Sequence, residues 1–226
     1  MNILRTENLT KIYGMDATKV IALDHIHLNI DKGQFVSIIG PSGSGKSTFL
    51  HMLGGVDRPT KGKIYIEETD ISSMNETELA IFRRRKVGLI YQSYNLIPTL
   101  NVEENIMLPM LLDGVKPKAE EFDRIVELLG LTERLKHLPG QLSGGQNQRV
   151  AIGRSLIYKP SIILADEPTG NLDKENTKAT LDLLKRSNQE YNQTIVMITH
   201  NEEIAQLADR RIKIVDGKIV SDEVTL

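Results

Sequence analysis

"GPSGSGKST" at Gly40–Thr48 decides the fold of this chain. It has the spacing G-x-x-x-x-G-K-S of a P-loop, the glycine-rich turn that holds nucleotide phosphates. The β-rich apolar run "QFVSIIG" leads into it, and "KSTFLHMLGG", which follows, predicts a helix stopped by Gly54-Gly55. A glycine-rich turn that binds nothing is the alternative, but the strand before the loop and the helix after it favour phosphate binding.

The residues of this loop have separate physical tasks. Gly43 and Gly45 permit backbone angles that turn successive N–H groups toward the phosphates, and the helix N-terminus adds partial positive charge. We expect Lys46 to reach the β- and γ-phosphates and the Ser47 hydroxyl to ligate Mg²⁺. The predicted phosphate-binding residues are Gly40, Pro41, Ser42, Gly43, Ser44, Gly45, Lys46, Ser47 and Thr48.

A second motif, "IILADEP", supplies two carboxylates. Asp166 ends a predicted buried strand, where its carboxylate can hold Mg²⁺ or a water bound to it. Glu167 follows, and a carboxylate there can orient or deprotonate an attacking water. On its own such a pair is usually helix-capping or solvated, but together with a P-loop it favours nucleotide hydrolysis.

The composition fits one globular domain of 226 residues, with 40% hydrophobic residues and a net charge of −2. This balance does not favour a nucleic-acid surface, and the short basic run Arg83–Lys86 is typical of a solvated helix end. The chain has no cysteine, which fits a reducing cytoplasm. "MNILRTENLT" lacks the features of a signal peptide, and no apolar run approaches the roughly 18 residues that span a bilayer. Any membrane role is therefore expected to come through a partner.

The hydrophobic pattern predicts an α/β fold with an inserted helical part. "VGLIYQ", "SIILAD" and "TIVMITH" are short apolar runs typical of strands buried on both faces, and a helix over about 174–190 separates the last two. Antiparallel strands are expected near the N-terminus, and a hairpin through Asp216-Gly217 at the end. We predict one domain, with an α/β core at 1–92 and 154–226 and a helical subdomain at about 93–153.

"QLSGGQNQRV" at Gln141–Val150 is a second glycine-rich stretch, but no lysine follows it. Together with the P-loop, Gln92 after "GLIY", "ILADE", "NLD" at Asn171–Asp173 and His200 after "MIT", it resembles the ATP-binding subunit of ABC transporters over nearly the whole chain. The resemblance implies a P-loop NTPase core of the RecA-like type. It also implies that two copies pack head to tail, with "LSGGQ" of one copy facing the P-loop of the other.

The resemblance also implies roles for single residues. Tyr13 in "KIYG" matches an aromatic that stacks on adenine, Gln92 a residue that senses Mg²⁺ and water, and His200 a contact of the γ-phosphate. The residues expected to contact the partner's ATP are Leu142, Ser143, Gly144, Gly145, Gln146 and Asp173. The catalytic residues are then Glu167, His200 and Gln92, the metal-site residues Ser47, Gln92 and Asp166, and the cofactors ATP and Mg²⁺.

"TGNLD", "YQSYNLIPTLNVEENIMLPM" and the extra stretch "GMDATKV" are similar to the macrolide-export and lipoprotein-release branch, MacB/LolD-like. That branch implies a cytoplasmic subunit on the inner face of the membrane, powering a separate permease for export or extrusion of antibiotics, peptides or lipoproteins. A cell-division or antibiotic-sensing module is the alternative, because the same motifs serve both. A scaffold without turnover is disfavoured by Glu167 and His200.

One loop is expected to meet the permease. The sequence predicts a loop, broken by Pro98, that contains Tyr94, Leu96 and Ile97. Apolar side chains are not expected on a surface loop unless a partner or another part of the chain covers them. In the family that the chain resembles, this region forms a groove for a short helix of the membrane subunit. The alternative is that these residues, with Leu100, Ile106 and Leu108, only pack the helical subdomain.

Overall fold

The computed structural model describes residues 1–224, without the side chain of Ala17, as an α/β fold with two sheets. The antiparallel sheet has the order β2-β1-β4-β5, from β1 (Asn2–Tyr13), β2 (Val20–Asp31), β4 (Lys61–Ile66) and β5 (Thr69–Asp70). The larger sheet has the order β10-β9-β3-β8-β7-β6, from β3 (Phe35–Ile39), β6 (Val87–Tyr91), β7 (Ile162–Asp166), β8 (Thr194–Ile198), β9 (Arg210–Val215) and β10 (Lys218–Val224). The predicted fold class is confirmed.

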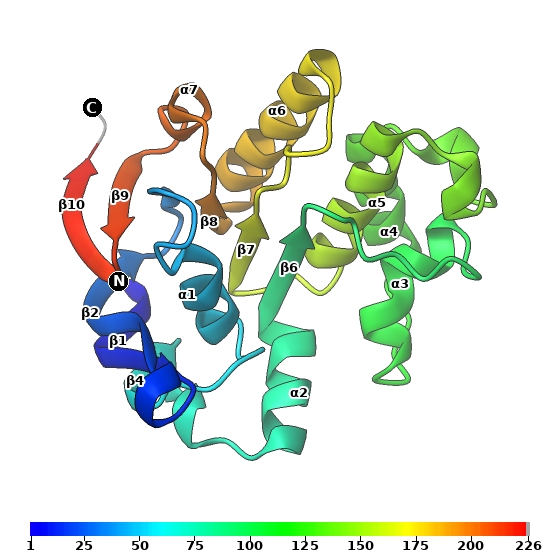
Figure 1. The fold of residues 1–226 in the computed structure, drawn as a ribbon. Coiled ribbons are helices and arrows are strands. Elements are labelled where there is room, and N and C mark those ends of the chain that lie inside the picture. Colours follow the sequence, from blue (N-terminus) through cyan, green and yellow to red (C-terminus); the bar gives the residue numbers. More distant parts are fainter. Residues whose placement is uncertain (225–226) are drawn as a thin grey trace.

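The central strands are buried on both faces, as their continuous apolar sequences predict. β3, β6, β7, β8 and β9 run parallel, and only β10 is antiparallel, through the turn at Asp216-Gly217. One face of this sheet packs on the antiparallel sheet and on α1 (Lys46–Leu53) in a shared hydrophobic core. The opposite face packs on helices in a second core. Figure 1 shows the blue antiparallel strands and the green helices at opposite ends of the molecule.

The helices follow from their end signals. Asn101 and Ser143 cap α3 (Val102–Leu111) and α5 (Gly144–Leu156) with reciprocal bonds to the third helical residue. The other helices are α2 (Glu76–Lys86), α4 (Ala119–Leu129), α6 (Lys174–Tyr191) and the short α7 (Glu202–Ala205). Within 93–153 the structure contains helices and loops but no strand. However, α5 continues to Leu156, so the boundary proposed at residue 153 falls inside a helix, and the division into core and subdomain stays a prediction.

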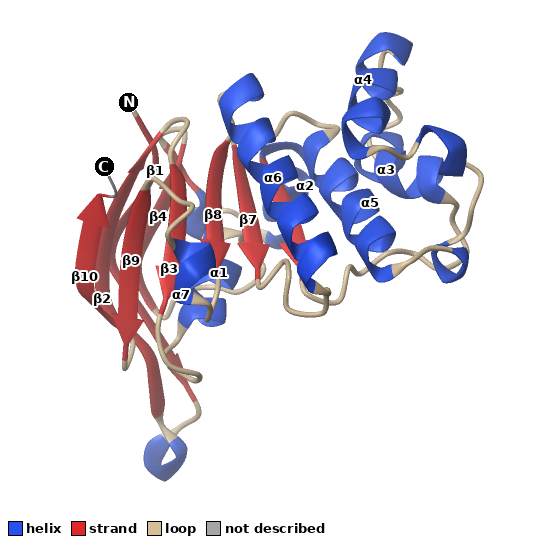
Figure 2. Ribbon diagram, turned by 90° about the horizontal axis from the view of Figure 1, so that it is seen from above, coloured by secondary structure: helices blue, strands red, loops and turns tan. Residues whose placement is uncertain are grey.

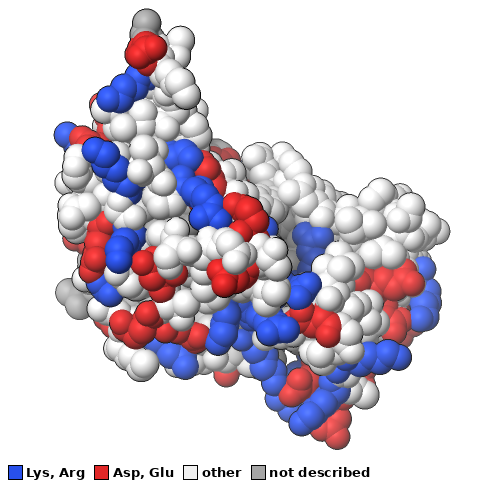
Figure 3. Space-filling model, turned by 90° about the horizontal axis from the view of Figure 1, so that it is seen from below, with Lys and Arg blue, Asp and Glu red and all other residues white. Residues whose placement is uncertain are grey.

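The outer surface has a projecting turn (Figure 2) and, on one face, an even distribution of charge (Figure 3). The turn between β1 and β2, which contains the short 3-10 helix Asp16–Thr18, projects from the end of the antiparallel sheet (Figure 2). On the face seen in Figure 3, basic and acidic side chains are interspersed rather than gathered by sign. Over residues 1–224, no helix combines the length and apolar character that a bilayer crossing requires.

Candidate nucleotide-binding site

The P-loop joins β3 to α1 and has the backbone that its glycines allow. Gly43 and Gly45 have φ values of 77° and 97°, in the left-handed region that favours glycine. A Cβ on Gly43 would meet no atom within 4 Å, so the loop is hollow at that point. The Lys46 ammonium lies inside the turn and donates to the carbonyl oxygens of Gly40 and Pro41 at 2.8 and 2.7 Å. Its charge is therefore held beside the hollow.

Asp166 stands at the end of β7, next to the P-loop helix. The Ser47 hydroxyl donates to its Oδ1 at 3.3 Å. Burial raises the pKa of the Asp166 carboxyl, and the Glu167 carboxylate acts in the same direction, although Ser47 and His51 oppose them. A divalent cation would favour the ionised form, so this hydroxyl–carboxylate pair fits Mg²⁺ bound together with phosphate oxygens. Among the described residues, no group of three or more His, Asp or Glu side chains could hold a metal ion by itself, in the absence of a nucleotide.

Glu167 and His200 form the opposite wall. Glu167 Oε2 lies 3.1 Å from His200 Nδ1, and the Glu167 amide donates to the Ile198 carbonyl at the end of β8 at 3.1 Å. Glu167 has a φ of 46°, in the left-handed region that is unusual for a residue with a side chain. Two adjacent parallel strands therefore bring these side chains together across 33 residues of sequence.

A cavity of about 720 Å³ joins the P-loop to Glu167 and His200, although Asp166 does not line it. Of the predicted residues it is lined by Tyr13, Ser42, Gly43, Gly45, Lys46, Ser47, Thr48, Glu167 and His200. It is also lined by Val20, Ile21, Ala22, Asp216 and Gly217, which the sequence did not single out. The Gly217 amide donates to the Ser44 carbonyl at 3.1 Å, so the last hairpin packs directly on the P-loop. The sequence indicates this turn, but nothing in it indicates the contact.

A second cavity, of about 560 Å³, lies where β6, β7 and β8 begin, at the other edge of the sheet. Its wall includes the Lys86–Glu67 and Lys159–Glu121 ion pairs, and none of the predicted site residues. This cavity is therefore separate from the P-loop chemistry.

Gln92 does not line the P-loop cavity. The Gln92 side-chain amide donates to Asn171 Oδ1 at 3.1 Å. The Asn171 side-chain amide donates to the backbone carbonyl of Gln92, also at 3.1 Å. The loop after β6 and the loop after β7 are thus joined by a reciprocal pair of hydrogen bonds. The sequence motifs "GLIYQ" and "NLD" indicate each residue but not their mutual contact.

The second glycine stretch, Leu142–Gln146, also lies outside the P-loop cavity. Ser143 and Gly144 are exposed, and Ser143 Oγ accepts a hydrogen bond from the Gln146 amide at 3.2 Å. Gly145 is buried against Asn176, and a Cβ there would lie 1.9 Å from Asn176 Oδ1, so a larger residue would displace the Asn176 side chain. Asp173 accepts bonds from the Asn176 backbone and side-chain amides, both at 2.8 Å. This stretch is therefore fixed by the start of α6.

Gln148 was missed by the sequence analysis. It is fully buried in α5 and donates to the Pro168 carbonyl at 2.7 Å. The helix that begins at Gly144 is thereby attached to the segment that carries Glu167. The sequence shows only a glutamine within a predicted helix, and nothing in it indicates that this side chain is buried or bonded to Pro168.

Several known proteins are similar to this chain over nearly its whole length. The family described as ABC transporter matches residues 23–170. The chain is 46% identical to the lipoprotein-releasing system ATP-binding protein LolD of Aquifex aeolicus, over 97% of each protein. It is 43% identical to the macrolide export ATP-binding/permease protein MacB of Bdellovibrio bacteriovorus, over 96% of this chain but 33% of that protein.

A solved structure is also similar. The ATP-binding cassette MJ0796 of Methanocaldococcus jannaschii, described as a dimeric post-hydrolysis state bound to ADP and Pi, superposes with a TM-score of 0.89. It is 40% identical to this chain, and the match covers 99% of both chains. The chain belongs to the ABC transporter family, as an ATP-binding, ATP-hydrolysing subunit. Within the family it belongs with the branch that includes LolD and MacB.

Proposed function

We propose that two copies of this chain bind two ATP molecules between them, head to tail, and drive a separate membrane permease. One observation carries the proposal: the exposed "LSGGQ" stretch does not reach the cavity lined by the P-loop of the same chain. Ser143 and Gly144 can offer hydroxyl and backbone donors only to a γ-phosphate held elsewhere, and a second copy supplies one. The dimeric state of the MJ0796 structure supports this arrangement.

In this proposal each side chain has a defined task. Lys46 neutralises the β- and γ-phosphates, and Asp166 with Ser47 holds Mg²⁺, whose charge offsets that of the phosphate oxygens. Glu167 accepts a proton from the attacking water, and His200 orients Glu167 and contacts the γ-phosphate. Gln92, now bonded to Asn171, responds when the γ-phosphate is gained or lost.

The expected result for the isolated chain is a monomer that becomes a dimer with ATP and Mg²⁺. Light scattering checks this by the mass in three samples: without nucleotide, with ATP and EDTA, and with ATP and Mg²⁺. Only the last sample should give twice the mass of one chain, because the dimer needs both the γ-phosphate of ATP, which bridges the two copies, and the Mg²⁺ bound to it. A mass that stays that of a single chain in the third sample, both for the parent and for Glu167→Gln, would contradict an ATP site shared between two copies.

The permease and the place of action are also part of the proposal. The relatives named LolD and MacB take part in lipoprotein release and macrolide export. We propose that this chain sits on the cytoplasmic face of the membrane, held there by a permease that moves a cargo of this broad kind. The chemistry described above provides energy but no cargo-binding surface.

A groove of about 460 Å³ between α2, β6 and α3 is the proposed docking place for the permease. Its wall includes Tyr91, Asn95, Leu108, Pro109 and Leu112. Leu112 is 62% exposed, so its apolar side chain is accessible to a partner at the groove. The sequence-based expectation needs adjusting here, because Leu96 and Ile106 pack into the core. The exposed Ile97, at the 93–101 loop, remains a candidate contact.

Tyr94 faces in another direction. The Tyr94 hydroxyl oxygen would lie 2.9 Å from a Cβ on Gly144. The Tyr94 backbone carbonyl accepts a hydrogen bond from the Arg154 guanidinium at 2.9 Å. Tyr94 therefore contacts the start of α5 and does not line the groove.

Leu112→Glu and Ile97→Glu should each abolish co-purification of the permease with the tagged chain from membranes of its own cells. The new charge would have to be desolvated in the apolar contact, whereas the fold should keep its melting temperature because both side chains are exposed. Leu207→Glu is the matched control, since Leu207 is as exposed as Ile97, at 41%, but lies after α7. Unchanged co-purification and unchanged ATPase stimulation in Leu112→Glu would remove the groove from the proposal. The same result in Ile97→Glu would remove the 93–101 loop as a permease contact.

A further inference from the structure

Tyr13 is held by two charged side chains that the sequence does not connect with it. Its hydroxyl donates to Asp57 Oδ2 at 2.6 Å. Lys11 Nζ donates to the other oxygen, Oδ1, at 2.6 Å and lies 4.7 Å from the centroid of the Tyr13 ring. Lys11 and Tyr13 are two residues apart in β1, so they share a face of the strand. The three side chains form a closed triangle.

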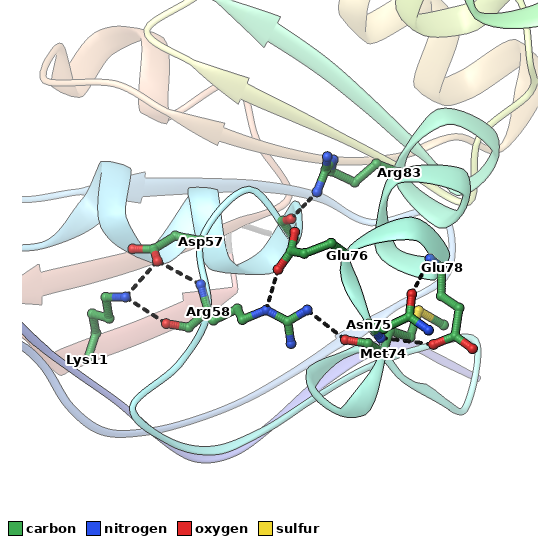
Figure 4. A network of polar contacts seen from close by, with 9 residues as sticks. Lys11, Asp57, Arg58, Met74, Asn75, Glu76, Glu78 and Arg83 are labelled. Carbon is green, nitrogen blue, oxygen red and sulfur yellow. Dashed lines mark hydrogen bonds and ion pairs between the residues drawn. The ribbon is translucent and has the colours of Figure 1, made fainter. Parts of the chain in front are cut away.

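Asp57 is itself fixed by its surroundings. Its Oδ1 accepts the Arg58 amide at 2.7 Å, and Lys11 donates to the Arg58 carbonyl at 2.7 Å. The Arg58 guanidinium then bonds Glu76 at 2.8 Å and the Met74 carbonyl at 2.7 Å, at the start of α2. Figure 4 shows this network running from Lys11 through the Asp57–Arg58 turn to α2. The turn therefore cannot shift without breaking contacts on both sides.

The charges suit this arrangement. Burial acts to raise the pKa of Asp57, but the hydrogen bonds from Lys11 and Tyr13 more than offset it, so the pKa lies below its usual value. Asp57 is thus a carboxylate, and a hydrogen bond to an ionised acceptor is stronger than a neutral one. Lys11 retains 12% of its side-chain exposure, whereas Tyr13 is 43% exposed and lines the P-loop cavity. The free part of the ring is available to a ligand.

We propose that Asp57, together with Lys11, is a positioning residue that holds the Tyr13 ring as the platform for the nucleotide base. A ring that is already oriented loses less rotational freedom when the base stacks on it. The inference rests on the proposed function, in which this chain binds ATP, and on the adenine stacking that the family resemblance implies for Tyr13. It adds that the effect of Asp57 is confined to the base and does not extend to the phosphates, which Lys46 and the loop amides hold.

The test compares two ligands of the isolated chain, Mg-ADP and inorganic pyrophosphate, neither of which requires a dimer. Asp57→Ala should weaken Mg-ADP binding about three- to tenfold, the range typical of one lost intramolecular hydrogen bond, because the lost contact orients the ring and does not itself touch the ligand. Pyrophosphate, measured by competition with ADP, should bind as it does to the parent. Glu67→Ala is the matched control, because it removes the Lys86–Glu67 ion pair of 2.7 Å far from Tyr13, and it should change neither affinity.

Tyr13→Phe separates positioning from folding, because it removes only the hydroxyl that contacts Asp57. It should weaken Mg-ADP binding as Asp57→Ala does, and Asp57→Ala should cause no further loss in a Tyr13→Ala background. An equal loss for pyrophosphate, an additive loss in that background, or parent-like ADP affinity of Tyr13→Phe would overturn the inference. A parent chain that does not bind Mg-ADP would instead contradict the proposed function.

Discussion

Replacing Glu167 by glutamine should lower the rate of ATP hydrolysis by roughly 10²–10⁴-fold, the contribution typical of a general base. Glutamine keeps the shape of the side chain, but its amide cannot take the proton of the attacking water. His200 would still have an oxygen acceptor within reach, since Glu167 Oε2 lies 3.1 Å from its Nδ1. Binding of Mg-ADP should stay close to that of the parent, and a stable ATP-bound dimer should accumulate.

The measurement is phosphate release by the isolated variant under saturating ATP and Mg²⁺. Glu202→Gln is a suitable control, because Glu202 is an exposed carboxylate at the start of α7, two residues after His200. It loses the same charge but lies outside the P-loop cavity, so its rate should match the parent rate. Hydrolysis at the parent rate by Glu167→Gln would show that another group activates the water.

The second large effect is expected at Ser143. Ser143→Arg should lower hydrolysis by roughly 10²-fold or more, comparable to losing a donor that stabilises transition-state charge. The guanidinium would fill the space that the partner's γ-phosphate needs, whereas the chain's own P-loop is untouched. Mg-ADP binding to the monomer should therefore stay near the parent value.

Ser143 also caps α5, so the arginine variant loses a cap, which costs about 1 kcal/mol of stability. Ser143→Ala loses the same cap without adding bulk, and its hydrolysis should remain well above that of Ser143→Arg. The comparison isolates the steric effect from the loss of the cap. An equal loss of Mg-ADP binding in the arginine variant would place the "LSGGQ" stretch beside the P-loop of its own chain. It would then contradict an ATP site shared between two copies.

Local sequence patterns were sufficient for the elements and for the first part of the site. The P-loop, the strand ending at Asp166 and the hairpin at Asp216-Gly217 each depend on neighbouring residues, and the structure has all three. Glu167 and His200 could be expected together because consecutive parallel strands end at the same edge.

Contacts between distant segments could not be predicted in the same way. Asp57 lies 44 residues from Tyr13, and a carboxylate after a helix is usually a solvated surface group. Gly217 reaches the P-loop only because β9 pairs with β3, and no local pattern specifies which strands are neighbours. The sequence does not predict that α5 continues beyond residue 153, because glycine disfavours a helix interior. In the structure Gly153 lies within α5 because the helix packs closely there: a Cβ on Gly153 would lie 2.6 Å from Leu129.

The position of β3 has a consequence for synthesis on the ribosome. Both neighbours of β3, β8 and β9, begin at Thr194 and Arg210, more than 150 residues after β3 ends at Ile39. At about 5–20 residues per second, the strand that carries the P-loop waits roughly 10–30 s for its partners. During that interval its apolar edges are open to wrong pairing, and chaperones have time to bind them. The cavity at the P-loop is lined partly by Asp216 and Gly217, so its complete wall exists only after most of the chain has been translated.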